Sequence, residues 1–392
     1  MKKFWPILIA IAFIAMASMP VMAASTEERI TAIEKQLAAT WKFYGSVRMT
    51  TFYNDFKAKD NHKDNSGSGI NDKGSTWTMQ VNSRIGAQVT IGDISGNFEY
   101  GHLSDGPYTR LLCGTWNFGP GQIVIGRDYT PLTWDINNKV YATDSLMHGF
   151  GQFYGDRENQ IKLIYGAFQF ALIDPTRGTT MPKTDPPSTY TGTDVYLPRI
   201  EVSYDLNFGP VTGRVIAGYK TFDIVANEDL ANEDEKSVDS YILALALKYA
   251  AGPFYAGLTG FYAQNVGAFA SAGSMVIRAN DNPDANGTTT FTDRSGYPDG
   301  DEDCKTWGFA VALGYKVSDM ISFEAGYGYQ QDKWDLAGSD SKLKATSYYL
   351  NMPITVAKNF WIIPEIGVEN FKSSDLKIGK TTYIGAKWQI NF

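Results

Sequence analysis

Arginine recurs in this sequence directly beside aliphatic residues, in segments where polar and apolar side chains alternate. Arg48, Arg84, Arg199 and Arg214 each adjoin one of the aliphatic residues Val47, Ile85, Ile200 and Val215. Successive side chains of a β-strand point to opposite faces of a sheet, so the guanidinium groups are predicted to share one face. A row of guanidinium groups attracts anions, and a facing row of carboxylates would add a transverse field that orients dipolar molecules.

One long connection, residues 128–157, lies between two more arginines. Arg127 precedes it, Arg157 ends it, and Asp135 and Asp144 within it are candidates for the facing carboxylates. We predict one charged cluster that comprises Arg48, Arg84, Arg157, Asp135 and Asp144, with Arg199 and Arg214 elsewhere on the same wall; strand parity does not orient Arg127 at the start of the connection. The alternative interpretation is ordinary solvated charge without a selective role.

β-Strands must position these residues, because the chain alternates apolar and polar side chains from residue 41 onward, with Gly, Pro, Asn and Asp at the ends of segments. The predicted strands are 42–53, 76–91, 94–102, 110–118, 120–127, 158–166, 168–174, 197–206, 211–222, 239–250, 253–265, 304–317, 320–333, 343–352, 358–371 and 379–392.

The sixteen predicted strands are joined by connections whose length follows their parity. Connections after even strands are tight, among them 92–93, 251–252 and 353–357, whereas those after odd strands are mostly long, including 128–157 and 266–303. An even strand count with short turns on one rim and long loops on the other is the layout of an outer-membrane β-barrel. We therefore predict an all-β fold, a 16-stranded antiparallel transmembrane barrel.

The alternation also predicts an apolar face with aromatic residues at its margins. In the segment 241–249, Tyr241 and Tyr249 enclose Leu243, Leu245 and Leu247. Aromatic residues on both sides of an aliphatic band are typical of barrel strands that cross a membrane. The intervening positions are small or polar and are predicted to line a water-filled interior.

Composition excludes several other classes of protein. The chain has 392 residues with 43% apolar and 14% aromatic residues, too polar for a bundle of membrane helices. A net charge of −7 argues against nucleic acid as a partner. Two cysteines, Cys113 and Cys304, lack metal-ligand spacing, and three histidines with no Gly-x-Ser-x-Gly motif argue against an enzyme. We expect no cofactor, no catalytic residue and no metal site.

The N-terminus carries two further signals. Residues 1–23 have a basic start, an apolar stretch and small residues before Ala23, which predicts a cleaved secretory signal peptide. Residues 24–40 are predicted to form a periplasmic helix, with a Ser25–Glu28 capping box and apolar residues at helical spacing. That helix could pack on the barrel or form a three-stranded coil at an oligomer axis. The barrel is predicted to span residues 41–392.

Short motifs resemble Gram-negative trimeric general-diffusion porins. Residues 126–129, Gly-Arg-Asp-Tyr, resemble the Gly-Arg-x-Tyr entry to the third loop of that family, and residues 82–86, Asn-Ser-Arg-Ile-Gly, resemble its Ala-Arg-Leu-Gly element. The connection follows the fifth of sixteen predicted strands, as in the family, and the chain is similar to the homotrimeric porins of sulfate-reducing bacteria. Residues 142–151 depart from the family's Pro-Glu-Phe-Gly-Gly-Asp core, so its acidic positions cannot be transferred.

The resemblance implies a third loop folded into the lumen and turns Arg127 inward, as the sixth member of the charged cluster. It also implies an outer-membrane porin for passive diffusion of small hydrophilic solutes and ions. The implied partners are outer-membrane lipid and lipopolysaccharide, further copies of the chain in a homotrimer, and the barrel assembly machinery. The final strand, with Trp388, Ile390 and Phe392 on one face, resembles the signal that this machinery recognises. Open alternatives are a substrate-specific anion or sugar channel and a structural or adhesive barrel.

Overall fold

The computed structural model describes residue 27 and residues 39–58, 71–103, 106–176, 190–226, 236–269, 303–336, 339–373 and 376–392. The predicted signal peptide 1–23 and nearly all of the predicted helix 24–40 lie outside the described residues. The strands are β1 Thr40–Ala58, β2 Asn71–Met79, β3 Arg84–Ile91, β4 Ile94–Leu103, β5 Gly106–Asn117, β6 Gly121–Tyr129, β7 Arg157–Tyr165, β8 Phe168–Ile173, β9 Tyr190–Asp194, β10 Arg199–Phe208, β11 Val211–Ala226, β12 Lys236–Ala251, β13 Phe254–Gln264, β14 Cys304–Lys316, β15 Ser322–Leu336, β16 Ser339–Asn351, β17 Ile354–Ala357, β18 Phe360–Ser373 and β19 Leu376–Asn391. A short helix, α3 (Tyr141–Asp144), follows β6, and a 3-10 turn, η2 (Val266–Phe269), follows β13.

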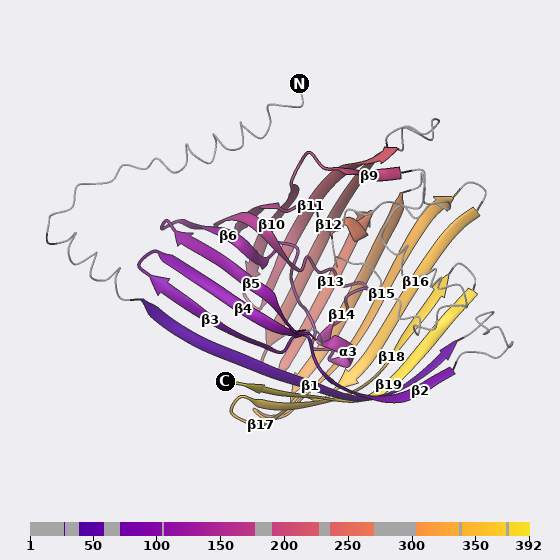
Figure 1. Cartoon of the computed structure of the whole chain (residues 1–392). Coiled ribbons are helices and arrows are strands. Elements are labelled where there is room, and N and C mark those ends of the chain that lie inside the picture. The colour runs from indigo at the N-terminus through magenta and orange to yellow at the C-terminus, as the bar shows by residue number, and fades with distance from the viewer. Residues whose placement is uncertain are drawn as a thin grey trace.

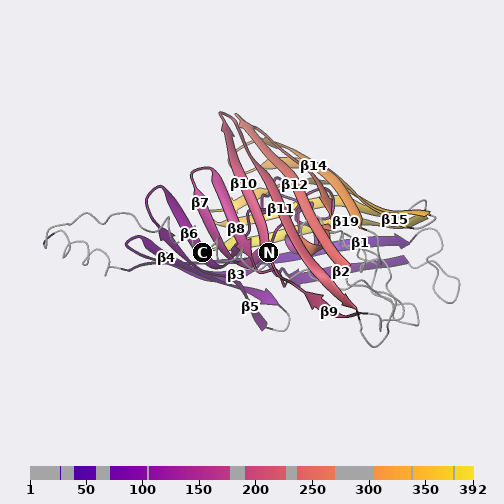
Figure 2. The same ribbon diagram turned by 90° about the horizontal axis from the view of Figure 1, so that it is seen from above.

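These segments form one antiparallel sheet that closes on itself. Each strand pairs with the next around the ring, and β1 pairs with β19 from Ser46 opposite Asn391 to Ala58 opposite Gly379. Figure 1 shows the resulting barrel from the side, and Figure 2 shows from above how the strands follow one another around it. The prediction of an all-β, closed sixteen-strand barrel is confirmed for the described residues.

Three of the sixteen strands are interrupted, which is why nineteen segments are present. β2 and β3 both pair with β1, β9 and β10 both pair with β11, and β16 and β17 both pair with β18. Pro198 and Pro353 lie in two of the breaks and have no N–H for the ladder. In the third break, Ser83 Oγ replaces a backbone partner, donating to Arg48 O at 3.0 Å and accepting from Arg48 N at 2.9 Å.

Several predicted boundaries are wrong in detail. The predicted strand 76–91 is two segments separated by residues 80–83, and the predicted connection 353–357 is mostly strand, since β17 occupies Ile354–Ala357. The connection predicted at 128–157 is shorter, because β6 continues to Tyr129 and β7 begins at Arg157. Strand parity could not locate these ends because the alternation continues across them.

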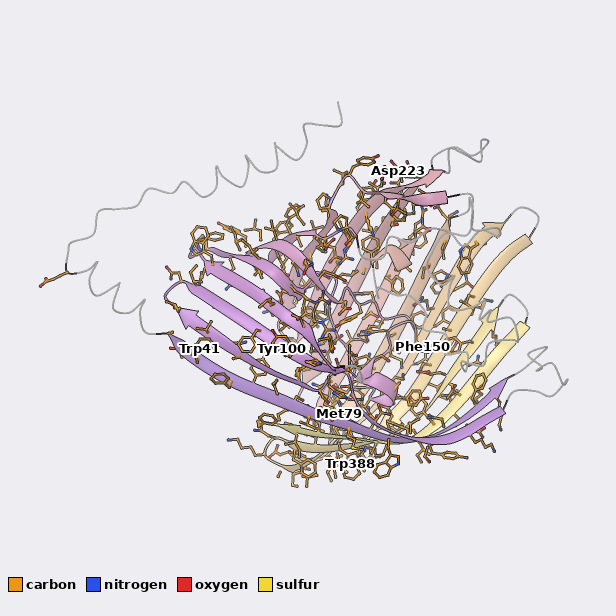
Figure 3. All side chains as sticks on the ribbon, in the orientation of Figure 1. Trp41, Met79, Tyr100, Phe150, Asp223 and Trp388 are labelled. Carbon is orange, nitrogen blue, oxygen red and sulfur yellow. The ribbon has the colours of Figure 1, made fainter. Side chains whose placement is uncertain are left out.

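The sheet has an apolar face and a polar face, as the alternation predicts. On β14, Trp307, Phe309 and Leu313 are exposed, whereas Ala310 and Ala312 on the other face are buried. Figure 3 shows Trp41 and Trp388, both exposed, on the outer surface of the barrel. Trp388, Ile390 and Phe392 share this apolar face, and Phe392 completes the closure by pairing its backbone with Gly45. No helix within the described residues is long and apolar enough to cross a membrane.

Candidate functional site

The segment between β6 and β7, residues 130–156, packs on the polar face of the sheet and is called here the β6–β7 segment. Leu132, Met147 and Phe153 have no exposed surface. They belong to one buried cluster that also contains Ile216 of β11, Ile242 of β12, Phe261 of β13, Trp334 of β15 and Phe371 of β18. Apolar packing therefore joins the segment to strands in one half of the barrel.

A second contact joins the segment to the strands at the closure. Tyr141 of α3 stacks on Tyr383 of β19, with ring centroids 3.7 Å apart, and Phe52 of β1 meets both rings edge-on. Asp144 then forms ion pairs with Arg48 of β1 at 2.6 Å and with Lys387 of β19 at 3.0 Å. The predicted meeting of Arg48 and Asp144 is therefore present in the structure.

Buried carboxylates of the wall accept hydrogen bonds from the backbone of the segment. Glu201 of β10 accepts from Leu132 N at 3.0 Å. Glu324 of β15 accepts from Asn138 N at 2.6 Å and from its amide side chain at the same distance. An irregular segment has N–H groups without secondary-structure partners, and leaving them unpaired would cost about 1–3 kcal/mol each. The carboxylates supply the missing acceptors.

Glu365 of β18 is the most highly connected of these acceptors. Its two oxygens accept from Val140 N at 2.7 Å and Tyr141 N at 3.0 Å, and also from Asn351 and the Tyr383 hydroxyl. Lys139, which directly precedes Val140 in the segment, forms a buried ion pair with Glu369 of β18 at 2.7 Å. Residues 138–141 are thus fixed by three acidic side chains: Glu324 and Glu365 hold the backbone, and Glu369 holds the Lys139 side chain.

Glycine allows the segment to approach the sheet closely. Gly151 has a φ of +92°, and a Cβ at this position would overlap the carbonyl oxygens of Phe309 and Tyr329. Its own carbonyl accepts a hydrogen bond from Thr259 Oγ1 at 2.9 Å. A Cβ at Gly328 of β15 would likewise overlap the carbonyl of Phe150. Backbone lies directly on backbone here, and only glycine permits that distance.

A different stretch of the ring, β3 to β7, carries a network of arginines. Arg110 is buried, donates to Glu99 at 2.5 Å, and bonds the side chains of Asn82, Tyr108 and Tyr129. Arg84 contacts the same Glu99, with Nε 3.3 Å from the carboxylate. One carboxylate therefore serves two guanidinium groups, and Arg84 remains 24% exposed.

Arg127 and Arg157 occupy different environments. Arg127 is 26% exposed and lies 3.9 Å from Glu158. Arg157 is nearly buried, bonds Asp156 at 2.9 Å, and lies over the Tyr129 ring at 5.5 Å. Arg127 therefore presents charge to solvent, whereas Arg157 mainly joins the end of the segment to β6 and β7.

The two arginines predicted elsewhere on the wall also contact buried groups. Arg199 has no exposed surface and lies 3.2 Å from Glu201. Arg214 bonds Asp205 at 3.1 Å, donates to the carbonyls of Pro131 and Thr133, and lies over Trp134. Arg214 thus holds the first turn of the β6–β7 segment.

Asp135, the other predicted facing acid, contacts none of the predicted arginines among the described residues. It is 51% exposed and lies 3.6 Å from His148 and 3.2 Å from the amide of Gln152. His148 stacks on Tyr154 at 4.4 Å. Burial raises the pKa of the Tyr154 hydroxyl, although nearby Arg157 opposes the shift.

A cavity of about 760 Å³ lies beside the segment at the rim formed by the tight turns. Its walls include Arg48, Asp135, Asp144 and Lys387, together with Lys248 of β12 and Lys316 at the end of β14. Three of the six residues predicted for the charged cluster, Arg48, Asp135 and Asp144, therefore line one cavity. Arg84, Arg127 and Arg157 do not line it.

Sequence reasoning missed most of the groups that hold the segment. These are Lys139, Glu201, Glu324, Glu365, Glu369 and Lys387, and it also missed Glu99, Arg110 and Lys162, which bond β3 to β6 beside the segment. Strand parity places Glu324 on the polar face, and the same pattern over 358–371 could have found Glu365 and Glu369. Their partners lie between 186 and 230 positions away in the chain, so no local signal reveals the pairing.

Solved structures resemble the chain although its sequence has no match among protein families or curated proteins. The outer membrane channel DcaP of Acinetobacter baumannii is 18% identical, with 90% of this chain and 97% of that chain covered and a TM-score of 0.64. The trimer form of OmpT from Vibrio cholerae is 17% identical, covering 90% and 99%, with a TM-score of 0.52. The anion-selective porin from Comamonas acidovorans is 15% identical, covering 90% and 100%, with a TM-score of 0.52.

The fold is that of the outer-membrane porins. At these identities the likeness concerns architecture: a closed sixteen-strand barrel with apolar side chains on its outer face, which is an integral outer-membrane design. The charged groups on the polar face must be interpreted from this chain's own contacts.

Proposed function

We propose that the protein is an outer-membrane porin in which small hydrophilic solutes and ions diffuse passively through a water-filled lumen lined by the polar face. The supporting observation is the position of the β6–β7 segment, which contacts Glu201 of β10, Glu324 of β15, Glu365 of β18 and, at the closure, Arg48 and Lys387. Contacts this widely spread around a closed sheet fit a segment that crosses the interior and narrows it. Charge at the narrowing would then influence which ions pass.

In this proposal the constriction lies between the β6–β7 segment and the arginine network of β3 to β7. Arg84 and Arg127 would supply its accessible positive charge, and Asp135 the accessible negative charge of the segment. Arg48 and Asp144 would neutralise one another at the edge, while Arg157, Arg199 and Arg214 would support the wall. The segment would serve as a fixed restriction, because buried packing and hydrogen bonds hold it.

Export, processing and assembly belong to the same proposal. Residues 1–23 would be removed as a signal peptide, residues 24–40 would form a helix in the periplasm, and the final strand would be read by the barrel assembly machinery. OmpT of Vibrio cholerae has a trimer form, which supports a homotrimer here. Lipid and lipopolysaccharide would surround the apolar face.

Planar bilayers provide the test. The purified, refolded chain should insert with large conductance steps, in groups of three for a trimer, that rise nearly linearly with salt concentration. Saturation by one sugar or one anion at low concentration would instead support a substrate-specific channel. A correctly folded barrel that never conducts would refute the porin function, and a structural or adhesive barrel would then be the better interpretation.

A further inference from the structure

Two lysines on the polar face have no acidic partner among the described residues. Lys248 of β12 and Lys316 of β14 are exposed and line the 760 Å³ cavity at the tight-turn rim. Lys248 Nζ lies 5.6 Å from the centre of the Trp134 ring, a contact that leaves its charge uncompensated. Both ammonium groups are therefore in contact with solvent and not with a carboxylate of the described residues.

The carboxylates near this cavity are mostly neutralised or covered. Asp144 is bonded by both Arg48 and Lys387, so this trio retains one positive charge. Asp135 is the accessible acid of the lining and contacts His148. The walls thus hold four cationic side chains and two carboxylates.

Glu324, a wall acid that bonds Asn138 of the cavity lining, does not reverse this balance. It is buried and accepts hydrogen bonds from Asn138 N, from the Asn138 amide and from the Tyr349 hydroxyl. Donors directed at a carboxylate offset its field, whereas Lys248 and Lys316 face the cavity without such compensation. A concave, low-dielectric wall concentrates the field of the remaining charge.

We propose that this cavity makes the channel prefer anions, namely small inorganic anions and small organic carboxylates. Lys248 and Lys316 are the residues that determine this preference. The inference rests on the proposed porin function. Glu201, Glu324 and Glu365 hold the β6–β7 segment and are removed from the ion path, while lysines at the tight-turn rim stay in it. Anions are concentrated there and cations are depleted.

The test is the reversal potential of the full chain in planar bilayers with a KCl gradient. The wild-type channel should be more permeable to chloride than to potassium. Replacing both lysines by glutamine (Lys248→Gln with Lys316→Gln) should lower the chloride-to-potassium permeability ratio by about twofold or more, because two unit charges leave one small cavity. Glutamate at both positions should make the channel prefer potassium.

Two controls separate charge from packing. Arginine at both positions keeps the charges and should keep the ratio, even though the contact of Lys248 with Trp134 changes. Lys344 of β16 and Lys372 of β18 lie directly opposite each other on the apolar face. Replacing both by glutamine (Lys344→Gln with Lys372→Gln) removes the same amount of charge and should leave the chloride-to-potassium permeability ratio unchanged.

The outcomes distinguish this inference from the porin function itself. A conducting channel that prefers potassium, or one whose ratio is the same with glutamine at both positions, overturns the anion preference and leaves the porin function standing. A folded barrel without conductance overturns both. Heat-modifiable migration on gels verifies that each variant is folded, and single replacements supply the answer if a double variant does not fold.

Discussion

The two walls of the polar face use charge in opposite ways. On β10, β15 and β18, the carboxylates of Glu201, Glu324 and Glu365 are at most 3% exposed and accept hydrogen bonds from the backbone of the β6–β7 segment. On β3, Arg84 of the polar face remains about a quarter exposed, and so does Arg127 near the end of β6. The acidic wall is therefore structural, and the basic wall retains charge in contact with water.

Chemistry explains the division. A loop that lies on a sheet brings N–H groups that need acceptors, and a carboxylate offers two oxygens with several acceptor positions each. A guanidinium group is a donor only, so it bonds side-chain carboxylates or loop carbonyls, as Arg214 does with Pro131 and Thr133. The charge of Glu201, Glu324 and Glu365 is thereby covered by the segment, whereas Arg84, Lys248 and Lys316 stay in contact with solvent.

The largest predicted effect comes from breaking the acidic wall. Replacing Glu324 and Glu365 together by glutamine removes charge-assisted acceptors for the N–H groups of Asn138, Val140 and Tyr141, each bond contributing about 1.5–3 kcal/mol. We expect the segment to detach, the single-channel conductance to rise severalfold and the thermal midpoint to fall. Conductance and circular-dichroism melting measure the two effects.

A matched control lies on the other wall. Glu99 is also a buried carboxylate, but its side-chain partners are Tyr44, Arg84 and Arg110. Glu99→Gln should therefore change conductance far less than the double variant. Equal conductance changes in the two variants would contradict the division of labour between the walls.

The next largest effect concerns the close approach at Gly151. Gly151→Ala would place a Cβ against the carbonyls of Phe309 and Tyr329 and should displace the segment locally, with lower stability and a raised, noisier conductance. Gly119→Ala is the control. Gly119 has nearly the same positive φ as Gly151, +93° against +92°, but no atom lies within 4 Å of an added Cβ. The difference between the two variants isolates the contact from backbone strain, and no difference would mean that the segment tolerates displacement.

The barrel could be predicted from the sequence because it depends on local periodicity. Alternation fixed the strand count and the face of Arg48, Arg84, Arg199 and Arg214. It would have misplaced Arg110, for which no prediction was made, because the register between β4 and β5 shifts between Glu99 and Tyr100, which face Leu111 and Thr109. Such a β-bulge inserts one residue, so alternation counted back from exposed Leu112 places Arg110 on the wrong face.

The candidate site was harder to predict because its pairs are distant in sequence. Asp144 could be proposed from its charge and its place in a long connection, and it does meet Arg48. Asp135 looked equivalent in sequence but contacts His148 instead. Which acid meets which base depends on how the segment crosses the polar face, and Glu365 and Gly151 set that path through contacts that no local pattern encodes.

The smallest predicted effect sharpens the description of the basic wall. Arg84→Gln with Arg127→Gln removes the two partly exposed guanidinium groups and leaves the buried Arg110 to compensate Glu99. Reversal potentials should shift toward cations, by about 1.5-fold in permeability ratio, less than for Lys248 and Lys316, because Glu99 and Glu158 already offset part of the arginine charge. Conductance should change little, since neither arginine contacts the β6–β7 segment in the described residues. If the permeability ratio stays at its wild-type value, the basic wall lies outside the ion path, and selectivity must be set at the tight-turn rim alone.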